Sequence, residues 1–240
     1  MTRDLHQIWV YLAASPLLGL TVTLVAYQAG YWLYRRSGHN PLVNPVLIAV
    51  VALVALLTLT GVDYATYFEG AQFVHFLLGP ATVALAIPLF QQLRQLRQSL
   101  LAILVSVVAG SLTAAGSAVG IAWLLGASRE TMLSLAPKSV TTPIAMGIAE
   151  KIGGLPPLTA VLVILTGMTG AMLTTYTLNF LGIQDWRARG LAIGVASHGI
   201  GTARAILVHP LAGAFAGLAM GLNGVATALL LPLLATWFGG

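Results

Sequence analysis

Long apolar stretches separated by short polar loops dominate this chain. Six of them are unbroken: residues 8–33, 46–60, 73–90, 100–125, 158–181 and 211–238. Two further segments, 131–152 and 189–208, are apolar but interrupted by glycine, proline and ionisable residues. A helix crosses a bilayer with about 20 apolar residues, and these runs lack the alternation of membrane barrel strands. The pattern predicts an all-α polytopic membrane protein with about eight membrane segments.

The two interrupted segments have two alternative paths. Each is long enough to cross once as a kinked helix, or to dip in and return as a re-entrant hairpin. The second half also repeats loosely with a period of about 57 residues, because Gly110 corresponds to Gly167 and the pair 138–139 to the pair 197–198. Internal repeats with interrupted helices at matching positions are typical of transporter binding sites.

Composition excludes a water-soluble fold. The chain is 58% hydrophobic and 7% charged, with a mean hydropathy of +0.91, whereas soluble domains carry about 25% charged residues. It contains no cysteine, which excludes disulfides and thiolate metal sites. Phosphate-loop, hydrolase and DNA-reading motifs are absent, so we expect no enzyme, cofactor, metal or nucleic-acid partner. We expect one integral membrane domain over 1–240, with N-terminal spans in 1–99 and a core in 100–240.

The charges of the early loops predict an orientation. The formal net charge of +5 comes from 11 Lys and Arg against 6 acids. Loops 35–39 and 94–97 are basic, whereas loop 63–69 is acidic. Because positive residues collect on the cytoplasmic side of membrane proteins, we expect the basic loops inside, and the acidic loop and the amino terminus outside.

The first interruption is built around two prolines. Pro137 disfavours helical geometry at the residue before it, and Pro143 cannot donate a hydrogen bond to the carbonyl of Ser139. Thr142 is the predicted N-cap of the helix that restarts there, with Pro143 in its first position. From Thr142 to Lys151 is about 13 Å of helix, and half a hydrocarbon core is about 15 Å. With Lys151 at an interface, Thr142 is predicted near the midplane.

The second interruption is built around two glycines. Gly199 and Gly201 allow backbone conformations that other residues resist. We expect Thr202 to cap a half-helix that ends at His209 and Pro210. Its length is about 10 Å, so this helix terminus is also predicted deep in the membrane.

Two helix amino termini at membrane depth form a predicted anion site. Their N–H groups and the positive end of the helix dipole favour an anion, and Lys138 and Arg204 lie beside them. A cation in the bilayer is costly and no acid follows Asp185, so we expect Glu150 or a bound carboxylate to compensate Arg204. His198 is able to donate a bond or carry a proton. Neutral side chains predicted for the same site are Ser139, Thr141, Thr142, Ser197 and Thr202.

Structural roles are the alternatives. Lys138 can extend to an interface, and His198 can simply pack between glycines. Arg204 and Glu150 can form a purely structural ion pair, with Glu150 or His198 otherwise carrying a proton. One helix face has a strip of glycines that suits close packing and a homo-oligomer: Gly213, Gly217 and Gly221. Asn223 follows that strip, and we expect it to bond a neighbouring helix rather than a ligand.

Five motifs lie in and around the interruptions: Pro137-Lys-Ser-Val-Thr-Thr-Pro-Ile-Ala145, Gly153-Gly154-Leu155-Pro156, Ala188-Arg-Gly190, Ala196-Ser-His-Gly-Ile-Gly-Thr-Ala-Arg204 and Gly221-Leu-Asn-Gly224. With these motifs the chain resembles the LrgB/CidB family of bacterial membrane proteins. Residues 1–125 match only in hydropathy. The resemblance implies a bacterial cytoplasmic membrane protein. It also implies a partner, a small LrgA/CidA-like membrane protein.

The resemblance implies one of two functions. The family name comes from antiholin-like proteins linked to murein hydrolase control and lysis. The plastid glycolate/glycerate translocator resembles a fusion of this domain with an LrgA-like domain, which implies transport of small hydroxy- or keto-monocarboxylates. Lys138 and Arg204 favour the transporter of small organic anions, because ionisable residues within a membrane are usually functional. The glycine strip suits the holin-like or antiholin-like alternative, in which helices associate to form or restrain a membrane lesion.

Overall fold

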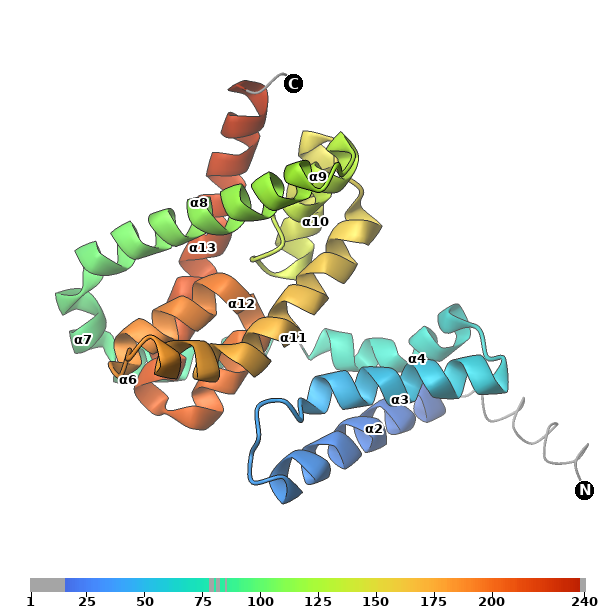
Figure 1. Cartoon of the computed structure of the whole chain (residues 1–240). Coiled ribbons are helices and arrows are strands. Elements are labelled where there is room, and N and C mark those ends of the chain that lie inside the picture. Colours follow the sequence, from blue (N-terminus) through green and yellow to red (C-terminus); the bar gives the residue numbers. More distant parts are fainter. Residues whose placement is uncertain (1–15, 78–79, 81–82, 85, 238–240) are drawn as a thin grey trace, which may run out of the picture. The chain divides into compact units, whose positions relative to one another are not determined.

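The computed structural model describes residues 16–77, 80, 83–84 and 86–237, and all its regular elements over those ranges are helices (Figure 1). The predicted all-α class is therefore confirmed for this part of the chain. The chain separates into two compact units, Met1–Ala84 and Leu85–Gly240. We call them unit 1 and unit 2 and describe each by itself.

The described part of unit 1 contains three helices, α2 (Pro16–Arg36), α3 (Pro45–Thr60) and α4 (Tyr64–Phe76). Asn44 caps α3, because its side-chain oxygen accepts hydrogen bonds from the backbone N–H groups of Val46 and Leu47. Gly19 on α2 leaves room for the α4 backbone, since a Cβ there would meet the carbonyl oxygen of Tyr67. None of the predicted site residues belongs to this unit.

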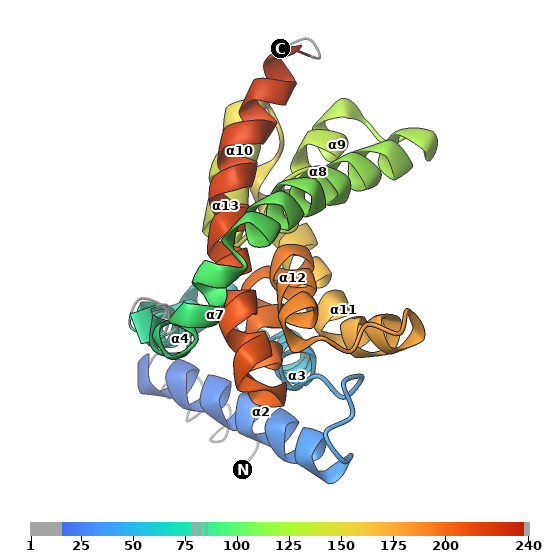
Figure 2. The ribbon, with the colours of Figure 1, turned by 90° about the vertical axis from the view of Figure 1, so that its left-hand side faces the viewer.

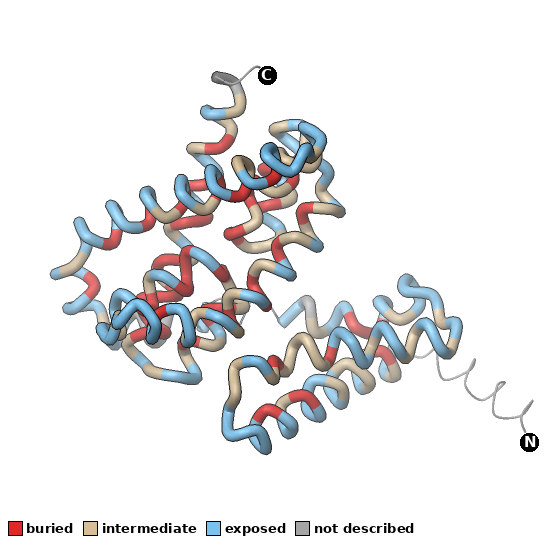
Figure 3. The backbone as a smooth tube through the Cα atoms, viewed as in Figure 1, coloured by how far each residue is buried: buried red, intermediate tan, exposed pale blue. Residues whose placement is uncertain are grey.

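Unit 2 is built on three long helices, α8 (Leu100–Leu124), α11 (Pro156–Phe180) and α13 (Pro210–Trp237). Short helices α6 (Ala86–Gln91) and α7 (Leu93–Gln98) precede them. The two interrupted segments lie between the long helices: α9 (Arg129–Leu135) with α10 (Thr142–Ile152), and α12 (Trp186–Val208). Buried residues gather where α12 and α13 meet (Figure 3).

Helix α12 folds back on itself, and we call it hairpin 2. Its only residue with non-helical φ/ψ is His198, at φ 40° and ψ −135°. The limb before His198 packs on the start of α13, because a Cβ on Gly190 would meet the carbonyl oxygen of Ala212. The limb after it returns to the same place, because a Cβ on Gly213 would meet the side chain of Ile206. The two ends of α12 therefore lie together, and His198 is at the tip.

The segment from α9 to α10 also returns on itself, and we call it hairpin 1. Its tip, residues 136–141, is non-helical. Its end meets the last turn of α9, because the N–H of Leu155 donates to Ser134 Oγ at 2.7 Å. Thr159 Oγ1, on the first turn of α11, donates to the carbonyl of the same serine at 3.0 Å. The predicted interruption at Pro137 is thus confirmed.

The two hairpins start from opposite ends of α11. Hairpin 1 closes beside Thr159, near the start of this 25-residue helix. Hairpin 2 closes beside its other end, because Arg189 Nη1 donates to Asn179 Oδ1 at 2.9 Å. These ends are about 37 Å apart at 1.5 Å per residue, roughly the thickness of a bilayer with part of its headgroups. The tips therefore approach each other from opposite directions.

Helix α13 receives one hairpin on each half. Ile144 of α10 packs against Gly224, and Ile148 packs in a cluster with Leu231. Gly194 of α12 packs against Ala216 in the first half. Figure 2 shows α10 along the upper part of α13 and α12 beside its lower part.

Two sequence expectations need revision. Within the described ranges, four helices are long and apolar enough to cross a membrane: α8, α11, α12 and α13. About eight spans are therefore not confirmed; α4, with 13 residues, is too short. The glycine strip is also only partly a packing face: Gly213 touches Ile206 closely, whereas nothing lies within 4 Å of a Cβ on Gly221.

The expected repeat is visible in the element boundaries. Helix α8 begins at Leu100 and α11 at Pro156, and each has 25 residues. The hairpins that follow them begin at Arg129 and Trp186. These starts are 56 and 57 residues apart, which agrees with the period read from the sequence.

Candidate functional site

The tip of hairpin 1 ends in an open helix amino terminus. Thr141, with extended backbone at φ −63° and ψ 146°, is the N-cap of α10, and its side chain makes no capping hydrogen bond. The prediction of Thr142 as the cap is wrong by one residue, because Thr142 already has helical geometry and Pro143 is second. Without a side-chain cap, the first N–H groups of α10 keep their capacity to bind an anion.

Lys138 lies at this tip. Its side chain is partly buried, and its Nζ donates a hydrogen bond to Ser139 Oγ at 3.2 Å. Ser139 itself is buried, 6% exposed. The ammonium is therefore held at the tip and does not extend along the hairpin toward its base.

The tip of hairpin 2 is a strained histidine. A positive φ costs a non-glycine residue about 1–3 kcal/mol, and His198 adopts it although Gly199 follows directly. The strain is compensated by a buried hydrogen bond, His198 Nε2 to the carbonyl oxygen of Val163 at 2.9 Å. Because a carbonyl only accepts, Nε2 carries a proton. The ring fits against α11 because Gly167 has no side chain; a Cβ there would come within 2.6 Å of it.

Ser197 lies beside His198 and is completely buried. It packs against Gly170 of α11, where a Cβ would collide with the serine hydroxyl. Among the described residues, its Oγ has no hydrogen-bond partner. Gly167 and Gly170 thus form the surface of α11 on which the tip of hairpin 2 rests.

Asn223 joins the two tips. It is 1% exposed and lies in the middle of α13. Its Nδ2 donates to the carbonyl of Ser139 in hairpin 1 at 3.2 Å and to the carbonyl of Val195 in hairpin 2 at 3.1 Å. The expected bond between helices is present. It also connects both interruptions, a relationship that the sequence did not indicate.

Two predicted site residues, Arg204 and Glu150, lie away from the tips, and a third, Thr202, has another role than the predicted one. Thr202 is not a cap but a helical residue, and its hydroxyl donates to the carbonyl of His198 at 2.8 Å. Arg204 is partly buried, six residues past the tip, or about 9 Å along the second limb. Glu150 is exposed near the end of α10. No ion pair joins Glu150 to Arg204 in the described structure, so the alternative in which Glu150 compensates Arg204 is not supported: the limbs that carry them run toward opposite ends of unit 2.

A polar cluster at the base of hairpin 2 was missed. Arg189 is 9% exposed, donates to Asn179 and to the carbonyl of Ile183, and lies 5.1 Å from the Trp186 ring centroid. Asp185 caps the helix, and its hydrogen bonds from Arg187 lower the pKa of the carboxyl to about 2. Arg189 belongs to the Ala188-Arg-Gly190 motif, and this motif was the feature of the sequence that could have pointed to the cluster.

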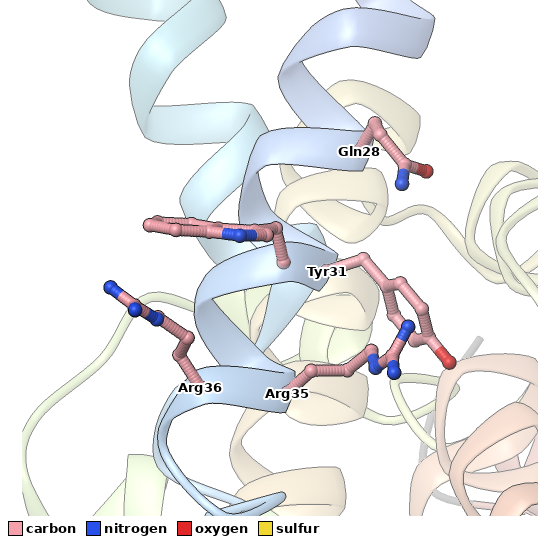
Figure 4. A pocket seen from close by; sticks show the side chains of 5 residues that line it. Gln28, Tyr31, Arg35 and Arg36 are labelled. Carbon is pink, nitrogen blue, oxygen red and sulfur yellow. The ribbon is translucent and has the colours of Figure 1, made fainter.

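Two cavities can be described in the residues that the structure covers. A groove of about 750 Å³ runs between α8 and α12 from Asp185 to Ala196, next to Ser197. Its lining is mostly small residues. Unit 1 has a shallow pocket of about 340 Å³ at the end of α2, where Tyr31 and Arg35 point to one side and Arg36 lies over Trp32 (Figure 4). Aromatic and basic residues at a helix end are typical of a membrane interface.

The fold and this site define an all-helical membrane protein with two opposed helical hairpins whose tips meet at one buried asparagine. The sequence matches the model of the LrgB-like family over residues 23–237, and the chain belongs to that family. The resemblance noted from the motifs is thereby confirmed.

Curated relatives cover almost the whole chain. The holin-like protein CidB of Staphylococcus epidermidis is 32% identical over 93% of this chain and 97% of its own length. The antiholin-like protein LrgB of Bacillus subtilis is 31% identical over 94% and 98%. The uncharacterized protein YxaC of Bacillus subtilis is 34% identical over the same shares. No solved structure matches this chain.

Proposed function

We propose that this protein is a secondary transporter of small monocarboxylates of the glycolate, glycerate, lactate or pyruvate kind, which bind between the two hairpin tips. The observation that carries the proposal is the Asn223 bridge between Ser139 and Val195. It brings two interrupted helices together in the middle of a 28-residue helix. Interrupted helices that meet at membrane depth are the common form of transporter binding sites.

The chemistry of the tips favours a small anion. The uncapped amino terminus of α10, the Lys138 ammonium and the Ser139 hydroxyl supply donors and positive charge. The three acids of unit 2 lie away from the tips: Glu130 and Asp185 begin the hairpins, and Glu150 is exposed. Because one asparagine side chain reaches both tips, a ligand bound between them would have few atoms.

The opposed hairpins suggest a transport path. We propose that both are re-entrant and open to opposite sides of the membrane, since their bases lie at opposite ends of α11. Displacement of one hairpin would expose the site to its own side, while the other hairpin keeps the opposite side closed. The His198 ring or Glu150 could carry a coupled proton.

A holin-like or antiholin-like function is the second candidate. The names of the relatives, holin-like CidB and antiholin-like LrgB, fit this function better than transport. It requires assembly in the membrane rather than a small-anion site. A homo-oligomer, a small LrgA/CidA-like partner and the bacterial cytoplasmic membrane remain predictions in either case.

Proteoliposomes that contain only this protein separate the two functions. Vesicles are loaded with a labelled monocarboxylate and with a large anionic dye. A transporter releases the carboxylate and retains the dye, whereas a lesion-forming protein releases both. If vesicles with well-folded protein retain both the carboxylate and the dye, this protein alone neither transports the carboxylate nor forms a lesion.

Lys138→Gln tests the site within the same assay. Loss of one partner of a desolvated charge costs about 2–5 kcal/mol, so carboxylate affinity should fall about thirty-fold or more. Lys151→Gln is the matched control, because Lys151 lies in the same hairpin but is exposed near its base. Normal flux in a folded Lys138→Gln protein would refute the anion site.

A further inference from the structure

The side-chain orientation of Asn223 is fixed by its two neighbours. The Nδ2 group has two N–H bonds, and both are used, on the carbonyls of Ser139 and Val195. The reversed amide would place Oδ1 against two carbonyl oxygens, none of which can donate. Oδ1 therefore faces away from these carbonyls.

This Oδ1 is a buried acceptor without a donor. In the described part of the chain it has no hydrogen-bond partner, and its residue is 1% exposed. Leaving an amide oxygen buried and unbonded costs free energy. Such atoms are few in folded proteins and call for a specific explanation. Because the amide is fixed next to the proposed anion site, a ligand group that donates a hydrogen bond to Oδ1 would explain this unbonded oxygen.

The ligand group that Oδ1 can bind must be a donor. The oxygens of a carboxylate or ketone only accept, so they repel Oδ1, whereas a hydroxyl can donate to it. The bonded carbonyl of Ser139 is two residues from the α10 N-cap Thr141 and one from Lys138. A ligand that binds both Asn223 Oδ1 and the positive tip at Lys138 and the α10 terminus therefore carries an anionic group and a hydroxyl a few bonds apart.

We infer that Asn223 makes the site selective for 2-hydroxy monocarboxylates over the corresponding 2-keto acids. The inference rests on the proposed monocarboxylate site and narrows its substrate class. Lactate would place its carboxylate at Lys138 and the α10 terminus, and its hydroxyl on Asn223 Oδ1. Pyruvate has the same carbon skeleton and charge, but its ketone oxygen would leave Oδ1 without a donor. Sites built to bond a substrate hydroxyl discriminate strongly against analogues that lack it.

Competition in the proteoliposome assay tests this with three ligands of equal charge. Labelled lactate uptake is competed with lactate, with pyruvate, and with 2-methylpropanoate, in which a methyl group replaces the hydroxyl. We expect lactate to compete at least about ten-fold better than either analogue. This comparison uses the unmodified protein, so it does not depend on whether a variant folds.

Asn223→Ala then assigns the selectivity to this residue. We expect the lactate-to-pyruvate ratio to fall to about one, a ratio that is independent of the amount of folded protein. Asn179→Ala is the control, because Asn179 binds Arg189 at the base of hairpin 2; it should leave the ratio unchanged. Equal competition by pyruvate and lactate in the unmodified protein would overturn the inference and leave the transporter intact. Absence of any carboxylate uptake would instead overturn the transporter itself.

Discussion

The rings of Trp186 and His209 stack with their centroids 4.7 Å apart and their planes at 2°, although one begins α12 and the other follows its end. In a straight helix these positions would be about 34 Å apart. The stack therefore closes the base of hairpin 2. Arg189, 5.1 Å from the Trp186 ring centroid, connects this base to the end of α11.

Trp186→Ala should loosen this closure. The substitution removes an aromatic stack and a cation–π contact, together with part of the packing, for a loss of about 2 kcal/mol. Reversible unfolding in detergent micelles would measure the loss. Trp123→Ala is the control, because Trp123 is 67% exposed on α8; it should change the free energy of unfolding by less than about 0.5 kcal/mol. Equal losses in both variants would mean that the stack contributes nothing specific.

Gly167→Ala should disrupt the tip of hairpin 2. The new methyl would come within 2.6 Å of the His198 ring, and such overpacking typically costs about 1–3 kcal/mol. Gly116→Ala is matched in chemistry but has nothing within 4 Å of the new Cβ. That control should be neutral or gain about 0.5–1 kcal/mol from helix propensity. A stable Gly167→Ala protein with an unchanged His198 environment by NMR would show that the ring does not need this space.

The interruptions were predictable from the sequence because proline and glycine act locally. Pro137 and Pro143 restrict the backbone wherever they stand, so the first break falls where expected. The second break was expected to spread over Gly199 and Gly201, but only His198 departs from helix. Its geometry depends on the hydrogen bond to Val163 and on the space at Gly167, and these contacts between distant residues leave no local signal.

The path of each hairpin was beyond sequence reasoning for the same reason. A run of 23 residues such as α12 has the length and composition of a crossing helix, and only its contacts with α13 show that it returns. Likewise, Arg204 and Glu150 have opposite charges and appeared compatible as a pair. Because the limbs that carry them diverge from the tips, their separation follows from topology rather than from charge.

The orientation of the first loops is open to direct measurement, because the chain contains no cysteine. Single cysteines at the exposed positions Ser37 and Gln95 should react only after the cytoplasmic side is opened. Ala65→Cys should react with an impermeant maleimide in intact cells. The reverse pattern would invert the predicted orientation without affecting the architecture of unit 2.

Labelling of the hairpin bases tests whether both hairpins re-enter. Cysteines at Glu130 and Lys151 mark the two ends of hairpin 1, and cysteines at Gln184 and Val208 mark those of hairpin 2; all four positions are exposed. If each hairpin returns to the side that it left, the two positions of a hairpin react from one face of the membrane. Because the hairpin bases lie at opposite ends of α11, the two pairs should react from opposite faces.

A crossing segment would give a different pattern. If Gln184→Cys and Val208→Cys react from opposite faces, α12 crosses the bilayer and does not fold back at His198. Leu165→Cys, 50% exposed and nearer the middle of α11, serves as a control that should resist the reagent from both faces, because the re-entrant arrangement places it inside the bilayer. If all four positions react as the re-entrant pattern predicts, each hairpin enters from a different face and the two tips meet inside the membrane. Alternating access to the Asn223 site requires this arrangement.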